Sequence, residues 1–157
     1  MVRILFVCLG NICRSPMAEA VFKEQMKEAG LANKVLIDSA GTAGWHEGSS
    51  PHEGTLKKLE EVNIPADYLT ARQLRKEDAI QYDFIIVMDE SNATDVQHLF
   101  SKAEGAPEIY RMMDFVENPP EKNVPDPFFT GDFDYTYTLI SQASQALQNY
   151  LIQNNYL

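Results

Sequence analysis

Near the N-terminus, the run Ile4 to Val7 consists of β-branched, aliphatic and aromatic residues that are typical of a buried strand. A helical pattern follows from Pro16, with Ser15 as its candidate N-cap. The residues between them must form a tight loop from a strand end to a helix N-terminus. Such a loop binds anions, because the first helical amides lack partners and the helix dipole is positive there. Cys8 and Arg14 add a thiol and a guanidinium that can face one tetrahedral oxyanion.

Strand and helix patterns alternate along the rest of the chain. Further strands are predicted over residues 34–40, 84–88 and 109–113, and helices over 16–29, 51–62, 77–80, 90–100 and 133–156. Ser50-Pro51 and Asp89 are the predicted starts of two of these helices. The alternation predicts right-handed βαβ units, hence an α/β three-layer sandwich with a parallel sheet covered by helices on both faces. Ligands bind such sheets beyond the carboxyl ends of the strands, where the Cys8 loop must lie.

Composition narrows the class of protein. A length of 157 residues fits a single domain over 1–157, and the formal net charge of −10 argues against a nucleic-acid partner. The two cysteines, Cys8 and Cys13, lie in one loop, which is no disulfide framework and favours a reducing cytoplasm. We see neither a signal peptide nor an apolar run long enough to span a membrane. We therefore expect a cytoplasmic monomer that binds no membrane.

The loop carries a specific motif. Cys8, five intervening residues, Arg14 and Ser15 form the C-x5-R-S pattern of cysteine-dependent phosphatases. The longer string from Phe6 to Ala20 closely resembles the start of the low-molecular-weight protein tyrosine phosphatases. The resemblance continues through the segments 38–42, 88–92 and 124–127, and so spans essentially the whole chain. It implies the strand order 2-1-3-4, a cysteinyl-phosphate intermediate, and no metal or other cofactor.

The phosphate-binding residues follow from the loop and the resemblance. A cysteine beside a cation at a helix N-terminus loses its proton readily, so Cys8 is expected to be a nucleophilic thiolate. Arg14 should hold two phosphate oxygens. The resemblance implies that Asn11 maintains the loop shape with support from Ser39, and that Ser15 hydrogen-bonds the thiolate. The backbone amides that complete the cradle belong to Leu9, Gly10, Asn11, Ile12, Cys13, Arg14 and Ser15.

The segment 114–132 is rich in proline and lacks periodicity, which is typical of a functional loop. By resemblance, Asp126 in it protonates the tyrosyl oxygen and then activates water; Asp132 and Asp134 are weaker rivals. Phe128 and Phe129 stand where the family usually has two tyrosines, and with Trp45 they are expected to form the walls around a phosphotyrosine ring. The family's counterpart of Cys13 can form a reversible disulfide with the nucleophile, so Cys13 is a redox candidate. No role is assigned to His46, His52 or His98.

The predicted function is hydrolysis of phosphotyrosine, and of small aryl phosphates, on the Cys8 thiol. Its expected partners are phosphotyrosine-containing proteins, a tyrosine kinase being one candidate. A phosphoarginine phosphatase is the nearest alternative, although relatives of that kind carry threonine where this chain has Ile12. An arsenate reductase is another, but the thioredoxin-coupled enzymes need further cysteines, which residues 14–157 lack. A non-catalytic phosphate-binding module also remains open.

Overall fold

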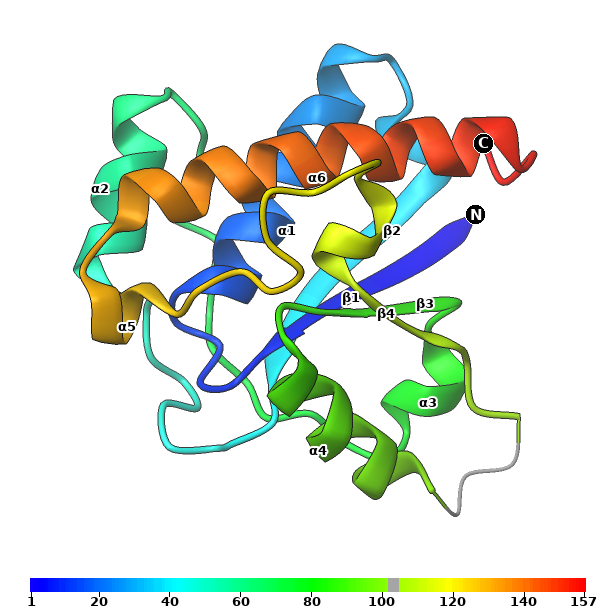
Figure 1. Ribbon diagram of the computed structural model, residues 1–157, viewed down its shortest axis with the longest axis horizontal. Helices are drawn as coiled ribbons and strands as arrows, with labels where there is room; N and C mark the ends of the chain where they lie inside the picture. Colours follow the sequence, from blue (N-terminus) through cyan, green and yellow to red (C-terminus); the bar gives the residue numbers. More distant parts are fainter. Residues whose placement is uncertain (102–104) are drawn as a thin grey trace.

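A four-stranded parallel sheet lies between two layers of helices in the computed structural model, which describes residues 1–101 and 105–157 (Figure 1). Its strands are β1 (Val2–Cys8), β2 (Val35–Gly41), β3 (Phe84–Val87) and β4 (Ile109–Arg111). The spatial order is β2-β1-β3-β4, with all three pairings parallel. Both the predicted fold class and the strand order implied by the resemblance are confirmed.

Six α-helices are present in the described part of the chain. They are α1 (Arg14–Glu28), α2 (Glu53–Glu61), α3 (Asp78–Gln81), α4 (Glu90–Phe100), α5 (Pro127–Thr130) and α6 (Phe133–Gln153), and 3-10 helices cover Ala32–Lys34 and Met112–Phe115. The predicted strand 109–113 is too long, because the Asp114 carboxylate accepts a hydrogen bond from the Arg111 amide at 3.0 Å and the chain turns there. The segment 114–132, predicted as loop throughout, contains α5.

Two helix starts differ from the prediction. α1 begins at Arg14 with Cys13 at its N-cap, and no side chain caps it, because the Ser15 hydroxyl hydrogen-bonds within the loop instead. α2 begins at Glu53, past the predicted Ser50-Pro51, and its cap is the His52 side chain, whose Nδ1 accepts a hydrogen bond from the Gly54 amide at 2.9 Å. In both cases a Ser-Pro pair has the residue types preferred at the N-cap and first position of a helix, but tertiary contacts determine where the helix begins.

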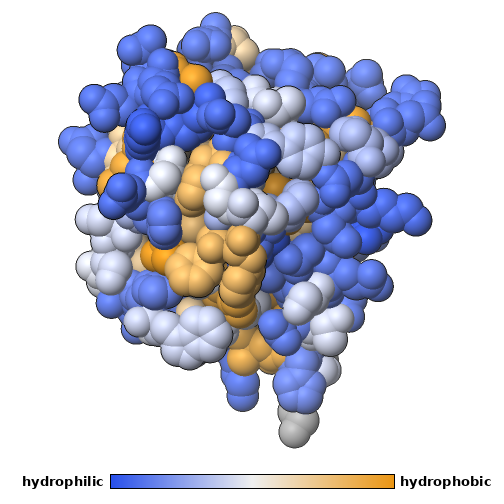
Figure 2. Space-filling model, turned by 60° about the vertical axis from the view of Figure 1, so that its left-hand side comes forward, coloured by the Kyte–Doolittle hydropathy of each residue, from blue (hydrophilic) through white to orange (hydrophobic). Residues whose placement is uncertain are grey.

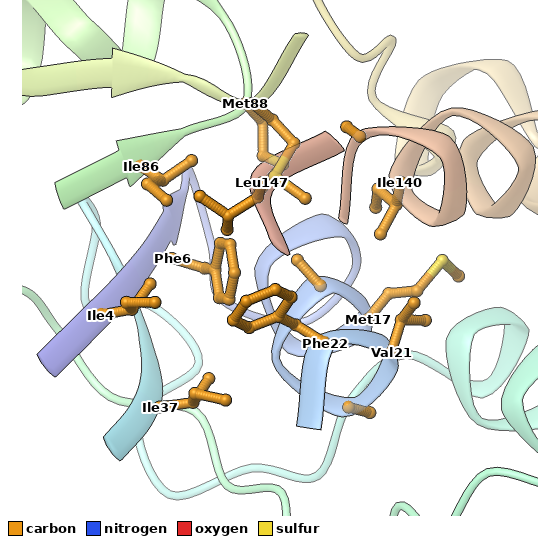
Figure 3. Close-up of a cluster of buried hydrophobic side chains, with 14 of the residues drawn as sticks. Ile4, Phe6, Met17, Val21, Phe22, Ile37, Ile86, Met88, Ile140 and Leu147 are labelled. Atoms are coloured by element: carbon orange, nitrogen blue, oxygen red, sulfur yellow. The ribbon is translucent and has the colours of Figure 1, made fainter. Parts of the chain in front are cut away.

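The sheet is buried on both faces. Ile4 and Phe6 face α1 and α6, where the Phe6 and Phe22 rings meet edge to face with centroids 5.9 Å apart (Figure 3). Leu5 and Val7 point the other way, into a cluster with residues of α4. Since successive strand residues alternate between faces, a strand covered on both sides must be apolar throughout, which explains the continuous run in β1.

The loops that follow the strands gather at the end of the sheet opposite both termini (Figure 1). The Thr42 amide donates to the Cys8 carbonyl at 2.9 Å, and the His52 amide donates to the Ile12 carbonyl at 2.7 Å. The Val124 amide donates to the Met88 carbonyl at 2.9 Å, which brings in the proline-rich segment. Among the residues described, no helix combines the length and apolar character needed to cross a membrane.

Candidate active site

The loop from β1 to α1 offers a row of amides to an anion. Within residues 1–101 and 105–157, the N–H groups of residues 9–15 donate no hydrogen bond to another protein group. Asn11 has φ of 56°, a left-handed conformation that asparagine tolerates better than most residues. This curvature places the seven predicted cradle amides on one loop at the N-terminus of α1. Backbone N–H groups and the helix dipole together favour an anion there.

Asn11 is held by hydrogen bonds on both ends of its amide. Its Nδ2 donates to Ser15 Oγ at 2.7 Å and to Ser39 Oγ at 3.0 Å, while its Oδ1 accepts from the Arg72 amide at 2.9 Å. Ser39 in turn donates to the buried Glu19 carboxylate at 2.7 Å. Burial raises the pKa of Glu19, although Lys23 and Ser39 hydrogen-bond to it and work in the opposite direction. The structure thus brings together Asn11 and Ser39, the two residues predicted to support the loop.

The two cysteines are both buried free thiols, but their surroundings differ. Cys8 Sγ lies 3.0 Å from the Ser15 hydroxyl. Burial raises the pKa of the Cys13 thiol to about 12, and negative charge at Cys8 and Asp126 adds to the shift. Cys13 is therefore protonated at neutral pH. The carbonyl of Cys13 accepts a hydrogen bond from the Thr55 hydroxyl at 3.1 Å, which ties this end of the loop to α2.

Arg14 is buried, with 2% of its side chain exposed. Its Nη1 donates to Asp89 Oδ2 at 2.6 Å and to the Val124 carbonyl at 2.9 Å, and its Nη2 donates to Asp126 Oδ2 at 3.3 Å. Burial by itself would lower the pKa of Arg14, but the negative charges of Cys8, Asp89 and Asp126 outweigh it and raise that pKa. The structure therefore places Asp126 beside a permanent cation of the loop, although 112 residues separate them.

A cavity of about 100 Å³ opens over the loop. Its lining includes Cys8, Leu9, Gly10, Ile12, Cys13, Trp45, His46, Asp126, Phe128 and Phe129. Trp45 and Phe129 are 74% and 76% exposed, so their rings form the rim. Figure 2 shows hydrophobic side chains gathered on this face of the molecule within a polar surface. The predicted wall residues thus share one cavity with Cys8 and Asp126, while Asn11, Arg14, Ser15 and Ser39 are buried beside it.

Three residues of the site were missed at the sequence level. Asp89 was predicted only as the cap of α4, which it is, but its second oxygen also holds Arg14. His46 lines the cavity beside Trp45. Because the two residues are adjacent in sequence, the prediction of Trp45 as a wall residue was the signal that could have indicated His46. His52, besides capping α2, stacks on Phe133 with ring centroids 5.1 Å apart and meets Phe128 edge-on at 6.1 Å. His52 therefore supports one wall of the cavity.

Comparison with known proteins defines the class of protein to which this fold and loop belong. The family model described as low molecular weight phosphotyrosine protein phosphatase matches residues 3–156. The chain is 42% identical over 147 residues to the low molecular weight protein-tyrosine-phosphatase YfkJ of Bacillus subtilis, covering 94% of both chains. It is 35% identical over 154 residues to PtpA of Staphylococcus aureus, covering 98% of this chain and 96% of that one.

Solved structures agree with these relatives. The crystal structure of YfkJ superposes with a TM-score of 0.94 at 40% identity, covering 98% of this chain and 96% of that one. A Drosophila arginine phosphatase gives a TM-score of 0.86 at 29% identity, covering 94% and 96%. The class is thus a cysteine-dependent hydrolase whose parallel sheet is covered by helices on both faces. The chain belongs to the low molecular weight phosphotyrosine protein phosphatase family.

Gly41, at the end of β2, makes a testable contact with the loop. A Cβ there would lie 2.8 Å from the Leu9 carbonyl oxygen and 3.0 Å from the Asn11 amide nitrogen, both backbone atoms. We expect Gly41→Ala to displace the loop, lowering kcat/KM for an aryl phosphate by roughly 10–100-fold. The free energy of unfolding should fall by about 1–3 kcal/mol, as for other overpacked sites. Initial rates and urea unfolding measure the two effects.

Gly44→Ala is the matched control for this prediction. A Cβ on Gly44 would lie 2.6 Å from Gln73 Oε1, which is the far end of an exposed, flexible side chain that can move away. Both rate and stability should therefore stay close to those of the unsubstituted protein. Equal losses in the two variants would contradict the idea that Gly41 is needed for backbone contact with the loop.

Proposed function

We propose that this chain hydrolyses phosphotyrosine on proteins, with Cys8 as nucleophile and no cofactor. One observation carries the proposal: Cys8 Sγ lies on a cavity that Asp126 and three exposed aromatic rings also line, above loop amides that donate to no other protein group among the residues that the structure describes. The phosphate would take hydrogen bonds from the amides of residues 9–15 and from Arg14. Electrostatic stabilisation of this kind is strongest in a buried site whose donors are already oriented.

In the first step, Cys8 Sγ attacks phosphorus and the bond from phosphorus to the tyrosyl oxygen breaks. The tyrosyl oxygen, with an ordinary pKa of about 10, is a poor leaving group as an anion, so Asp126 donates a proton to it. In the free protein Asp126 is 3.3 Å from Arg14. A bound phosphate would take over the guanidinium and release the carboxyl group for this proton transfer.

In the second step, water attacks phosphorus and the bond between phosphorus and Sγ breaks. The Asp126 carboxylate accepts the proton of that water, which returns it to the acid form. The Ser15 hydroxyl, 3.0 Å from Sγ, is placed to donate a hydrogen bond to the departing thiolate. Each residue thus ends the cycle in the state in which it began.

Ring selectivity is proposed to come from Trp45, Phe128 and Phe129. Aromatic walls can pack against a phenyl ring. Each aromatic pair contributes about 0.5–1.5 kcal/mol in addition to the energy gained from the buried apolar area. The substrates would be phosphotyrosine-containing proteins, and a tyrosine kinase is one candidate. We further propose that the protein acts as a monomer in the cytoplasm. The Phe pair has no hydroxyl to phosphorylate, so any control at these positions must differ from that in relatives with tyrosines.

The residue at position 12 supports phosphotyrosine over phosphoarginine as the substrate. Ile12 lines the active-site cavity and offers no hydrogen-bond acceptor to a guanidinium, whereas threonine would. We expect the protein to cleave a phosphotyrosine peptide at least about tenfold faster, by kcat/KM, than the matched phosphoarginine peptide. Ile12→Thr should shift this ratio toward phosphoarginine. Phosphate release from both peptides, with a metal chelator present, measures it; preference for phosphoarginine in the unsubstituted protein would reject the proposal.

A further inference from the structure

A second hollow of about 580 Å³ adjoins the active-site cavity. Leu9 and Trp45 line both. The new wall comes from α4, which contributes Thr94, Asp95 and His98, and the loop after β2 adds Thr42. We call this hollow the α4 groove.

Trp45 belongs to the linings of both hollows. A phosphotyrosine ring fills a cavity of only about 100 Å³, so the peptide that carries it must leave over the rim. Trp45 is 74% exposed and contributes to the rim that the active-site cavity shares with the α4 groove. A peptide that crosses the rim at Trp45 enters the α4 groove within a few residues, since an extended chain advances about 3.3 Å per residue.

The α4 groove carries one exposed negative charge. Asp95 is exposed, and it forms no ion pair with any residue in the described ranges 1–101 and 105–157. It is the one acidic side chain among the groove's described lining residues. The chain as a whole carries a formal net charge of −10, which favours approach of basic segments.

Building on the proposed function, we propose that the α4 groove binds the substrate segment next to phosphotyrosine and that Asp95 selects a lysine or arginine in it. Asp95 is then a specificity residue and takes no part in the chemistry. Because the contact is exposed, its effect is modest: an ion pair of this kind corresponds to about a threefold to fivefold preference. The preference should shrink at high salt.

Phosphotyrosine peptides that differ only in a lysine or a glutamate test this, the variable residue being moved through the first four positions on either side. At one or more positions we expect a kcat/KM about threefold to fivefold higher for the lysine peptide. Asp95→Asn should abolish the preference and Asp95→Lys should reverse it. Neither variant should change kcat/KM for a small aryl phosphate, which cannot reach the groove.

Glu28→Lys is the matched control. Glu28 is exposed at the last turn of α1, which places it about 20 Å from the loop at the other end of the helix. It changes net charge by the same amount as Asp95→Lys, so it should leave the lysine preference intact. An equal change in both variants would show an effect of overall charge and overturn the proposal, as would a peptide preference that Asp95→Lys does not alter.

Failure of the groove and failure of the catalytic proposal remain distinguishable. If aryl phosphate is hydrolysed but the peptides show no charge preference, the α4 groove is rejected while the mechanism stands. If no hydrolysis occurs, the affinities of the peptides for Cys8→Ser still test the α4 groove. A preference for the lysine peptide that depends on Asp95 supports peptide binding in the groove, and equal affinities for the two peptides reject it.

Discussion

Replacing Cys8 with serine is expected to lower kcat/KM for an aryl phosphate by roughly 10³-fold or more. A serine hydroxyl holds its proton far more tightly than a thiol does. In the part of the chain that the structure describes, the side chain hydrogen-bonded to Sγ is the Ser15 hydroxyl rather than an imidazole or carboxylate that could remove this proton. Phosphate binding should persist, because the cradle amides and Arg14 are unchanged.

Two measurements check this result. Initial rates are compared with a metal chelator present, and rapid acid quenching followed by mass spectrometry locates a phosphoryl group on Cys8 of the unsubstituted protein. A thermal shift with inorganic phosphate then shows whether Cys8→Ser still binds the anion. Retained hydrolysis, or a phosphoryl group on another residue, would reject Cys8 as the nucleophile.

Cys13→Ser is the natural control, since it changes the other cysteine of the same loop. Burial raises the pKa of Cys13 to about 12, so its thiol stays protonated at neutral pH and is a poor nucleophile. We expect a loss of less than about tenfold in kcat/KM, arising from altered packing. A thiol-alkylating reagent should accordingly modify Cys8 before Cys13. A loss as large as that of Cys8→Ser would contradict this assignment.

The strands of this fold are predictable because they are buried on both faces. Ile4 to Val7 and Phe84 to Val87 are apolar without interruption, and β-branched residues dominate the second run. Local rules failed where a side chain has a better partner elsewhere. Ser15 has the residue type and position of an N-cap, but its hydroxyl lies between Cys8 Sγ and Asn11 Nδ2, and the helix starts without it.

The candidate site likewise contains residues that the sequence predicts and residues that it does not. The loop from Cys8 to Ser15 is contiguous, so its residue types and its place before a helix suffice to predict an anion site. Asp126 is remote in sequence, and only the family resemblance assigned it to the same cavity. The Val124 carbonyl that accepts from Arg14 could not have been predicted, because a backbone oxygen carries no signal in the sequence. Such contacts depend on how loops cross at the end of the sheet.

Asp126→Asn is expected to lower kcat/KM by about 10²–10⁴-fold for substrates with a poor leaving group such as phenol or tyrosine. Asparagine has nearly the same shape and can still accept the hydrogen bond that Asp126 Oδ1 takes from the Phe128 amide at 3.0 Å, so α5 keeps its cap. What it cannot do is donate a carboxylic proton. With an acidic leaving group such as 4-nitrophenol, the proton matters less and the loss in kcat/KM should be much smaller.

The dependence of log kcat/KM on leaving-group pKa, measured over a series of substituted aryl phosphates, should therefore become steeper in Asp126→Asn. Because the same residue is proposed to activate water, the variant should also show a burst of the phenol followed by slow turnover, as the cysteinyl phosphate accumulates. Asp132→Asn is the control: Asp132 caps α6 through the Tyr135 amide, which asparagine can also do, so the slope should stay unchanged. A loss in Asp126→Asn that is uniform across leaving groups would mean that the carboxylate only positions Arg14, 3.3 Å away, and does not deliver the proton.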